Sequence, residues 1–379
     1  MISYKYKLYN NKRLKHLDNM KREACFVWNH ALALQKRYYK LYGKYISATK
    51  MQKHFSKRIK RTYLHSQSLQ EVLQRLDTAY NRFFKRTSKR PPRFKKHSDF
   101  HSFCYKQGGF TLCGNVLHIN SVDKDYRFWL SRPWRGNIKN VRLKYSPKGE
   151  WYLYVVTDAI SEPIAKSHNG ASVGIDFGLK TYMTLSDGII IDSPQYLKRS
   201  LSTLRGLSRS LSKKKKGSNH RNIAKRRLAA FHEHVANSRL DFHWKLAHAL
   251  CREYDYIFIE DLNLNGMKKL WGRKVSDLAY GQFVGVLKQV AVKYRVIIHE
   301  IERYYPSSRL CECGYKNDSL SLSDRQWVCP RCGRIHDRDL NAAGNILRRG
   351  IYELGSDYKT FEAAADGLVA SSTQESHVL

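Results

Sequence analysis

The sequence is poor in acidic residues and has no long hydrophobic run. Its 379 residues include 69 Lys and Arg but only 32 Asp and Glu, which leaves a formal net charge of +37. No apolar stretch reaches the roughly 18 residues of a membrane-spanning helix, and the start MISYKYKLYNNKR has no apolar signal core. We therefore expect neither a membrane protein nor a secreted one, and place the chain in the cytoplasm.

The excess of basic side chains requires a polyanionic partner, because such a charge makes a folded chain repel itself. Nucleic acid fits best, since each phosphate neutralised by Lys or Arg releases a condensed counterion. Hydrophobic residues make up 42% of the sequence, enough for buried cores, so a disordered basic tail is excluded. We expect a globular nucleic-acid-binding protein with two or three domains.

The first half of the sequence predicts a small β-barrel that carries a helical insertion. Residues 1–9 alternate like an edge strand, and a helical period then continues to residue 88. A loop, RPPRFKK, ends the helical block. The strands expected after it are 103–105, 109–112, 116–119, 127–130, 140–145 and 151–157. The predicted domain boundaries are 1–10 and 90–160 for the barrel, 11–89 for the insertion and 161–169 for a linker.

The second half alternates strands with helices. A three-strand meander over residues 173–191 is followed by two helices, an apolar strand, a helix over 280–294 and a further strand. The order β-β-β-α-β-α-β-α predicts a mixed α/β sheet of RNase H topology. The predicted boundaries are 170–305 and 337–352 for this domain, 306–336 for a cysteine-rich insertion and 353–379 for a mobile tail that includes Ser371, Ser372, Thr373 and Gln374.

Three acidic residues lie at the ends of apolar elements. Asp176 lies in VGIDFGLK, a strand too apolar for an unpaired carboxylate without a reason, and Glu260 ends the strand in YIFIEDL. Asp339 lies in HDRDLNAAGNI, immediately before an apolar helical stripe. Asp337 competes with Asp339 for this third position. The alternative is that Asp176 and Asp339 are turn or cap residues and Glu260 a surface acid.

These three acids predict a metal-dependent nuclease. If the strands of Asp176 and Glu260 are neighbours, their carboxylates share one edge of the sheet, and Asp339 can face both. Like charges that converge in this way repel one another, and divalent cations relieve the repulsion. Two Mg²⁺ ions (or Mn²⁺), spaced by about 3.5–4 Å, can activate water and stabilise the leaving oxygen in phosphodiester hydrolysis.

Four of the eight cysteines are clustered. Cys311 and Cys313 form a C-x-C knuckle, and Cys329 and Cys332 form a C-x₂-C knuckle stiffened by proline. In a chain without secretory features this spacing predicts a structural zinc ribbon and argues against disulfides. His336 or water is an alternative ligand, because the first knuckle is one residue short. The other four thiols are expected to be small buried side chains: Cys25, Cys104, Cys113 and Cys251.

Residues 193–232 contain twelve Lys or Arg and no acid. Leucine stripes predict two helices, joined by a turn at Lys213–Lys216. A solvated helix face is the alternative, but the complete absence of acids favours a surface that faces phosphates. The residues expected to contact nucleic acid are Lys213, Lys214, Lys215, Lys216, Arg221, Arg226 and Arg227, together with Arg93 and Lys95 of the RPPRFKK loop.

With these features the sequence resembles the TnpB family of transposon-encoded proteins, which is related to the type V CRISPR effector nucleases. The motifs that carry the resemblance are CFVWNHALALQKRYY, PRFK, VGIDFGLKTYMTLSDG, ANSRLDFHWKLA, IEDLNLNGM, PSSRLC and DRDLNAAGNI. The resemblance implies an endonuclease that is guided by an RNA from the transposon end and that reads a short DNA motif beside its double-stranded target.

The resemblance also implies roles for particular residues. Asp176, Glu260 and Asp339 match the three acids of a RuvC site, and the four clustered cysteines match the ligands of a ribbon that binds target nucleic acid. The barrel and its insertion match the wedge and recognition domains. We expect a monomeric ribonucleoprotein associated with the nucleoid of a prokaryote. A guided repressor that does not cut DNA, and a transposase that joins DNA ends, are the alternatives.

Overall fold

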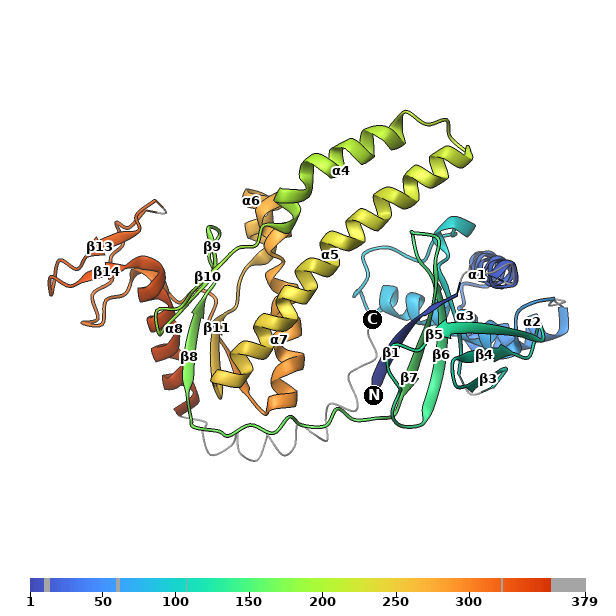
Figure 1. The fold of residues 1–379 in the computed structure, drawn as a ribbon. Coiled ribbons are helices and arrows are strands. Elements are labelled where there is room, and N and C mark those ends of the chain that lie inside the picture. The colour runs from blue at the N-terminus through green and yellow to red at the C-terminus, as the bar shows by residue number, and fades with distance from the viewer. Residues whose placement is uncertain (10–13, 59–61, 107, 322, 356–379) are drawn as a thin grey trace. The chain divides into compact units, whose positions relative to one another are not determined.

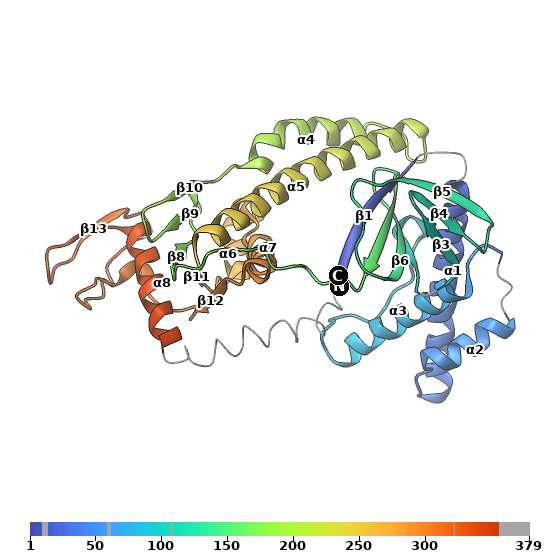
Figure 2. The ribbon, with the colours of Figure 1, turned by 60° about the horizontal axis from the view of Figure 1, so that its bottom comes forward.

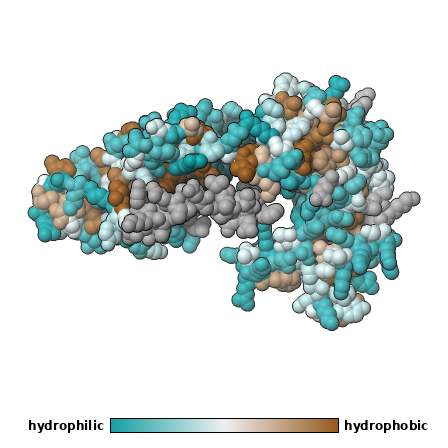
Figure 3. Space-filling view, turned by 90° about the horizontal axis from the view of Figure 1, so that it is seen from below, coloured by the Kyte–Doolittle hydropathy of each residue, from teal (hydrophilic) through white to brown (hydrophobic). Residues whose placement is uncertain are grey.

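The chain divides after residue 160 into two units, Met1–Ile160 and Ser161–Leu379. This computed structural model describes residues 1–9, 14–58, 62–106, 108–321 and 323–355 (Figure 1). Hydrophilic side chains cover most of the face seen in Figure 3, with smaller apolar areas between them. Within the described residues, no helix is both long and apolar enough to cross a membrane.

Unit 1 contains the predicted barrel as a nearly closed, seven-stranded sheet. Its strands follow the order β2-β6-β7-β1-β5-β4-β3, so the N-terminal strand lies in the middle and pairs with β7 and β5. Alternate residues such as Tyr4, Tyr6 and Leu8 face inward and are buried. The strands are β1 (Ile2–Leu8), β2 (Ser102–Tyr105), β3 (Phe110–Cys113), β4 (Val116–Ile119), β5 (Lys124–Trp129), β6 (Ile138–Tyr145) and β7 (Trp151–Thr157).

The predicted helical insertion lies between β1 and β2. It consists of α1 (Leu14–Tyr42), α2 (Ala48–Arg58) and α3 (Ser66–Phe84). Each helix buries one stripe, and these stripes join the barrel interior in a single apolar core. Trp28 of α1 is buried in this core, and its indole N–H donates to the backbone carbonyl of Arg93 at 3.0 Å. The loop that follows the insertion is thereby fixed to α1.

Unit 2 contains the predicted mixed sheet. Its strands are β8 (Ser172–Asp176), β9 (Thr181–Leu185), β10 (Ile190–Asp192), β11 (Tyr256–Glu260) and β12 (Ile297–Ile301). The order is β10-β9-β8-β11-β12, with β8, β11 and β12 parallel. Helices α5 (Asn219–Glu253) and α7 (Tyr280–Tyr294) contribute to the core on one face, and α8 (Arg338–Gly355) covers the other (Figure 1). The fold prediction is confirmed.

The basic segment forms a helical hairpin. Helix α4 (Tyr196–Ser212) and α5 run side by side in antiparallel directions (Figure 2), and Lys213–Lys216 lie in the turn between them as predicted. The start of α4 is held by Asp277, whose carboxylate accepts hydrogen bonds from the backbone N–H groups of Leu197 and Lys198 at 2.9 and 3.0 Å. The hairpin is therefore anchored at its base.

Several expectations for the chain path were wrong. A helix was missed, α6 (Leu264–Leu278), because its sequence is interrupted by glycines and its backbone leaves helical geometry at Trp271. The linker over 161–169 stays a prediction: these residues form no helix or strand and directly follow the division between the units, and the N–H of Ile164 donates to the carbonyl of Lys293 at 2.6 Å. Cys113 is exposed. Helix α8 continues to Gly355, so the expected tail starts later, and residues 356–379, with Ser371–Gln374, lie outside the described residues.

Candidate metal and nucleic-acid sites

Two of the three predicted acids end neighbouring strands. Asp176 is the last residue of β8, and Glu260 is the last residue of β11. These strands are parallel, and the pair immediately before the acids, Ile175 and Ile259, is in register. The two carboxylates therefore lie side by side at the carboxyl end of the sheet, as a β-strand with a side-chain period of two requires.

The third acid is carried to this edge by helix α8, which packs unusually close to the sheet. A Cβ on Gly174 of β8 would lie 2.2 Å from the carbonyl oxygen of Ala343 in α8. A Cβ on Gly350 of α8 would lie 2.0 Å from the Phe258 ring of β11. Both contacts are possible only because neither residue has a side chain. The sequence did not predict these roles: Gly174 interrupts an apolar strand, whereas Gly350 lies in an amphipathic helix directly after Arg348 and Arg349.

Asp339 lies in the first turn of α8, at the end of the helix nearest the acids of the sheet. Asp337, its competitor for this role, accepts a hydrogen bond from the N–H of Leu340 at 3.0 Å and so caps the helix. Asp339 instead forms an ion pair with Arg325, whose Nη1 lies 3.3 Å from Oδ2. Of the two candidates, Asp339 is the one whose carboxylate is not used to start the helix.

Asp176 is the acid whose pKa is affected by both of the others. Burial, together with the carboxylates of Asp339 and Glu260 and against the opposing charge of Arg338, raises the pKa of Asp176 to about 7. Burial also raises the pKa of Glu260 to about 7, but the carboxylate that adds to this shift is Asp261. Ionising Asp176 beside two other carboxylates costs free energy because like charges repel one another. A bound divalent cation would relieve this repulsion.

Tyr280, which was not predicted as a site residue, holds the loop after Asp176. The hydroxyl of Tyr280, at the start of α7, donates to the carbonyl of Gly178, and its other neighbour is the carbonyl of Tyr182 at 3.4 Å. Burial and the nearby Asp176 raise the pKa of this hydroxyl, so it remains a donor. The turn that follows Asp176 is thus fixed to α7.

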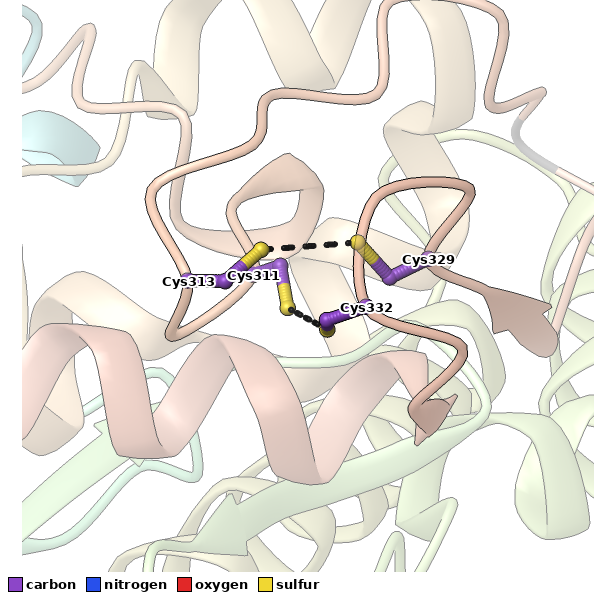
Figure 4. A group of neighbouring side chains, drawn as sticks. All are labelled: Cys311, Cys313, Cys329 and Cys332. Atoms are coloured by element: carbon purple, nitrogen blue, oxygen red, sulfur yellow. Dashed lines mark hydrogen bonds between the residues drawn. The ribbon is translucent and has the colours of Figure 1, made fainter.

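The four clustered thiols converge as predicted. Strands β13 (Gln326–Val328) and β14 (Ile335–Asp337) form the ribbon, and the sulfurs of the two knuckles point toward one another (Figure 4). Cys311 and Cys332 have their sulfurs 3.5 Å apart, and Cys313 and Cys329 have theirs 3.6 Å apart. All four lie within 4.8 Å of one another. This arrangement fits a tetrahedral zinc ion.

Within the described residues, these thiols are the one group of three or more potential ligands that meets the 4.8 Å distance. The three carboxylates are spaced more widely, with Asp339 engaged by Arg325. His336, the alternative zinc ligand, lies beside the cluster: its Nε2 is 3.1 Å from the sulfur of Cys311, and its ring stacks on Trp327. Both cysteines of the short first knuckle therefore belong to the cluster, and His336 is not needed to replace either of them as a ligand.

The predicted phosphate contacts differ in their surroundings. Lys213–Lys216, Arg226 and Arg227 are exposed on the hairpin. Arg221 instead braces the turn, since its Nη1 donates to the carbonyls of Leu211 and Lys214, each at 2.9 Å.

The two candidates in the loop after the helical insertion also differ. Arg93 is exposed, whereas the ammonium of Lys95 lies 4.0 Å from the centre of the Trp28 ring. Burial lowers the pKa of Lys95, which suits a packed side chain better than a phosphate contact.

The barrel, the sheet with its helices and the ribbon resemble solved structures in their fold. A Cas12f1 protein, solved in a complex with its guide RNA and target DNA, aligns with a TM-score of 0.57 at 12% identity, over 89% of this chain and 83% of its own. A mini-RNA-guided endonuclease, CRISPR-Cas_phi3, aligns with a TM-score of 0.57 at 9% identity, over 92% of both chains. The fold is Cas12f-like, with a barrel, a RuvC-like sheet and a four-cysteine cluster.

Sequence comparison gives the family. The OrfB_IS605 model, described as "Probable transposase", matches residues 154–270, and the model of the Cas12f1-like TNB domain matches residues 280–346. A "Putative RNA-guided DNA endonuclease" of Streptomyces pristinaespiralis is 33% identical over 75% of this chain and 71% of its own. The InsQ protein of Escherichia coli (strain K12), named in the same way, is 31% identical over 86% and 87%. The chain belongs to the TnpB (OrfB_IS605) family.

Proposed function

We propose that this chain is an RNA-guided DNA endonuclease that hydrolyses phosphodiester bonds at the edge of the sheet in unit 2. The relatives at 31–33% identity carry this activity in their names. The single observation that carries the proposal is that Asp176 and Glu260 end neighbouring parallel strands, with Asp339 in the first turn of the helix that packs on them. A chain that keeps three acids together at the end of an apolar sheet needs cations there.

In this proposal Asp176, Glu260 and Asp339 are the metal ligands. Divalent cations bound there would activate a water molecule and stabilise the leaving oxygen of the scissile phosphate. Asp176, whose pKa both of the other acids affect, is the carboxylate suited to be shared, and Asp339 must exchange Arg325 for a cation. The guanidinium released in this exchange remains next to the site, where it is available to an anionic strand.

The remaining parts are proposed to hold the nucleic acids. The barrel (residues 1–10 and 90–160) and the helical insertion (11–89) would hold a guide RNA from the transposon end and read the motif beside the target. The ribbon (306–336), with zinc, would bind the target strands. The exposed lysines and arginines of the α4–α5 hairpin would contact phosphates without reading sequence. The working particle is proposed to be a monomeric ribonucleoprotein.

The test uses the full chain purified with its own RNA. Sequencing that RNA gives the guide, and a plasmid carrying the matching target is then incubated with the particle and Mg²⁺. Asp176→Ala is expected to abolish cleavage while RNA content and plasmid binding stay close to the wild type. Asp192→Ala is the matched control, because Asp192 is an exposed acid that also ends a strand of this sheet, β10, but is separated from β8 by β9.

Each other result has a definite meaning. Cleavage by Asp176→Ala at an unchanged rate would contradict the assigned ligands. Target binding by the wild type with no cleavage in Mg²⁺ or Mn²⁺ would favour the guided repressor. Products that join the ends of the transposon to the plasmid would favour the transposase, which is the description attached to the matching family model.

A further inference from the structure

The two residues that follow Asp176 are both held by Tyr280, the first residue of α7. The hydroxyl of Tyr280 donates to the carbonyl of Gly178, and its ring lies 4.9 Å from the Phe177 ring, centroid to centroid. The last residue pair of β8 and β9 is Asp176 with Thr184, so the Gly178 carbonyl lies outside the ladder of these strands. The tyrosine therefore fixes a segment of backbone that the sheet itself does not hold.

Side chains alternate along β8, and this alternation places Tyr280 and the Asp176 carboxylate on opposite faces of the sheet. Ile175 belongs to the apolar core that includes α7, whereas Gly174 meets α8. Asp176 is two residues after Gly174 and therefore faces α8, the helix that carries Asp339. Tyr280 can thus fix the direction of the Asp176 carboxylate without occupying a position that a cation needs.

The turn between β8 and β9 is folded closely on itself. A Cβ on Gly178 would lie 2.8 Å from the Thr181 hydroxyl and 3.2 Å from the Thr181 carbonyl oxygen. The Tyr280 hydroxyl has a second neighbour beyond this turn, the carbonyl of Tyr182 in β9, at 3.4 Å. One hydroxyl group therefore reaches backbone on both sides of the turn, and its removal should release the turn as a unit.

The backbone adopts an unfavourable conformation immediately before Tyr280. Ala279 ends α6 and starts α7 with φ at 50° and ψ at 47°, in the left-handed region that residues with a Cβ seldom adopt. Such conformations persist where surrounding contacts determine them, and they cluster at functional sites. Here the left-handed residue directs the Tyr280 side chain into the core, where it is fully buried.

Tyr182 is a second buried tyrosine in the same core, and its hydroxyl has a different partner. The rings of Tyr182 and Tyr280 pack at a centroid distance of 5.4 Å, and the two side chains are equally buried. The Tyr182 hydroxyl lies 3.1 Å from Nε2 of His243 in α5. Burial lowers the pKa of His243 to about 4, so its imidazole is neutral at pH 7. Removing either hydroxyl disturbs the same core, but only that of Tyr280 donates to the turn after Asp176.

Resting on the proposed function, we propose that Tyr280 is a positioning residue for the divalent-cation site, and that its hydroxyl sets the cation concentration at which this site fills. It acts through the Gly178 carbonyl and keeps the Asp176 carboxylate directed toward the other acids. Loss of a group that orients a metal ligand typically weakens metal binding by about 10- to 100-fold. Because Tyr280 acts on Asp176 through the backbone, we expect the lower end of this range.

The first measurement does not depend on cleavage. Mn²⁺ is titrated into the full chain, purified without chelators and freed of nucleic acid, and the free ion is followed by electron paramagnetic resonance. Asp176→Ala gives the binding that does not involve the three acids. Tyr280→Phe keeps the ring and loses only the hydroxyl, so the dissociation constant of the remaining component should rise by about 10-fold. Tyr182→Phe, the matched control, should keep the wild-type value, and thermal melting checks that both variants are folded.

Cleavage of the matched plasmid by the particle with its RNA gives a second readout. Tyr280→Phe should need about 10-fold more Mg²⁺ for its half-maximal rate, and it should approach the wild-type rate in saturating Mg²⁺, because all three acids remain. A purely structural role would lower the maximal rate through loss of folded protein and leave the Mg²⁺ requirement unchanged. That result would overturn the proposal.

The outcomes separate this inference from the proposed function. Unchanged Mn²⁺ affinity in Tyr280→Phe, beside a loss in Asp176→Ala, would refute the positioning role and leave the metal site intact. Equal weakening in Tyr280→Phe and Tyr182→Phe would assign the effect to general packing of the core and would also refute it. Equal Mn²⁺ binding by the wild type and Asp176→Ala would contradict the metal site itself, and the positioning role with it.

Discussion

The close approach of α8 to the sheet sets the position of Asp339, and one methyl group tests this. In Gly174→Ala the new Cβ would lie 2.2 Å from the Ala343 carbonyl oxygen, whereas ordinary contact begins at 3.4 Å. The atoms nearest the new Cβ are the Ala343 carbonyl oxygen and the Leu347 backbone nitrogen, both in the backbone of α8. The helix must therefore move away by roughly 1 Å. Asp339 is one helical turn before Ala343 and must move with it.

Two effects of this shift are expected. Overpacking of this kind costs about 1–3 kcal/mol of unfolding free energy, which thermal or urea unfolding will detect. A displacement of about 1 Å at a reacting centre can lower a rate about 100-fold. We therefore expect Gly174→Ala to cut the matched plasmid about 100-fold more slowly than the wild type in Mg²⁺, while its content of copurified RNA is unchanged.

Gly344→Ala is the matched control, since it lies on the same helix and its Cβ would meet nothing closer than Arg348 at 3.9 Å. Replacing this glycine should leave cleavage intact and raise stability by up to about 1 kcal/mol through helix propensity. If Gly174→Ala is destabilised yet cuts at the rate of the wild type, the placement of α8 does not govern the metal site. If it is neither destabilised nor slower, the close packing itself is wrong.

Three further predictions concern the charges and metals. Burial and like charge raise the pKa of Asp176 from 3.8 to about 7, so without divalent cations the free energy of unfolding should fall as pH rises from 4 to 7. Thermal melting should show this fall in the wild type, and an equal fall in Asp176→Asn would show that Asp176 is not its cause. Cys329→Ser should lose zinc measured by mass spectrometry, whereas Cys113→Ser should keep it, and a zinc-free wild type would contradict the ribbon. Replacing Lys213–Lys216 with Ala should reduce the log–log salt slope of DNA binding by up to about 3 to 4, and an unaltered slope would show that this turn faces solvent.

Much of the fold followed from periodicity and spacing. The alternation in MISYKYKLY, the apolar strands that end at Asp176 and Glu260, and the leucine stripes of the hairpin all predicted elements within a few residues of those observed. The cysteine spacing predicted that four thiols converge. These signals are local or repeat with a fixed period, so a single sequence displays them.

The features that were missed depend on contacts between distant segments. Helix α6 has no uniform apolar stripe, and its kink at Trp271 interrupts the period. The role of Gly174 becomes visible only when α8 is placed against β8. The proximity of the Lys95 ammonium to the Trp28 ring likewise depends on how the loop packs on α1. The ion pair between Arg325 and Asp339 depends on how the ribbon folds, so the sequence alone does not predict it.

Helix α8 connects the proposed site at the three acids with the cysteine cluster. Near its start it carries Asp339, and the amides of Asn341 and Asn345 donate to the Leu310 carbonyl beside the first knuckle, both at 2.8 Å. The ribbon also supplies Arg325, which competes with a cation for Asp339. We therefore expect zinc occupancy to alter the affinity of the proposed site for divalent cations, in which case those cations alter the affinity for zinc by the same factor. A chelator selective for zinc should consequently shift the Mg²⁺ requirement of the protein before it unfolds the ribbon.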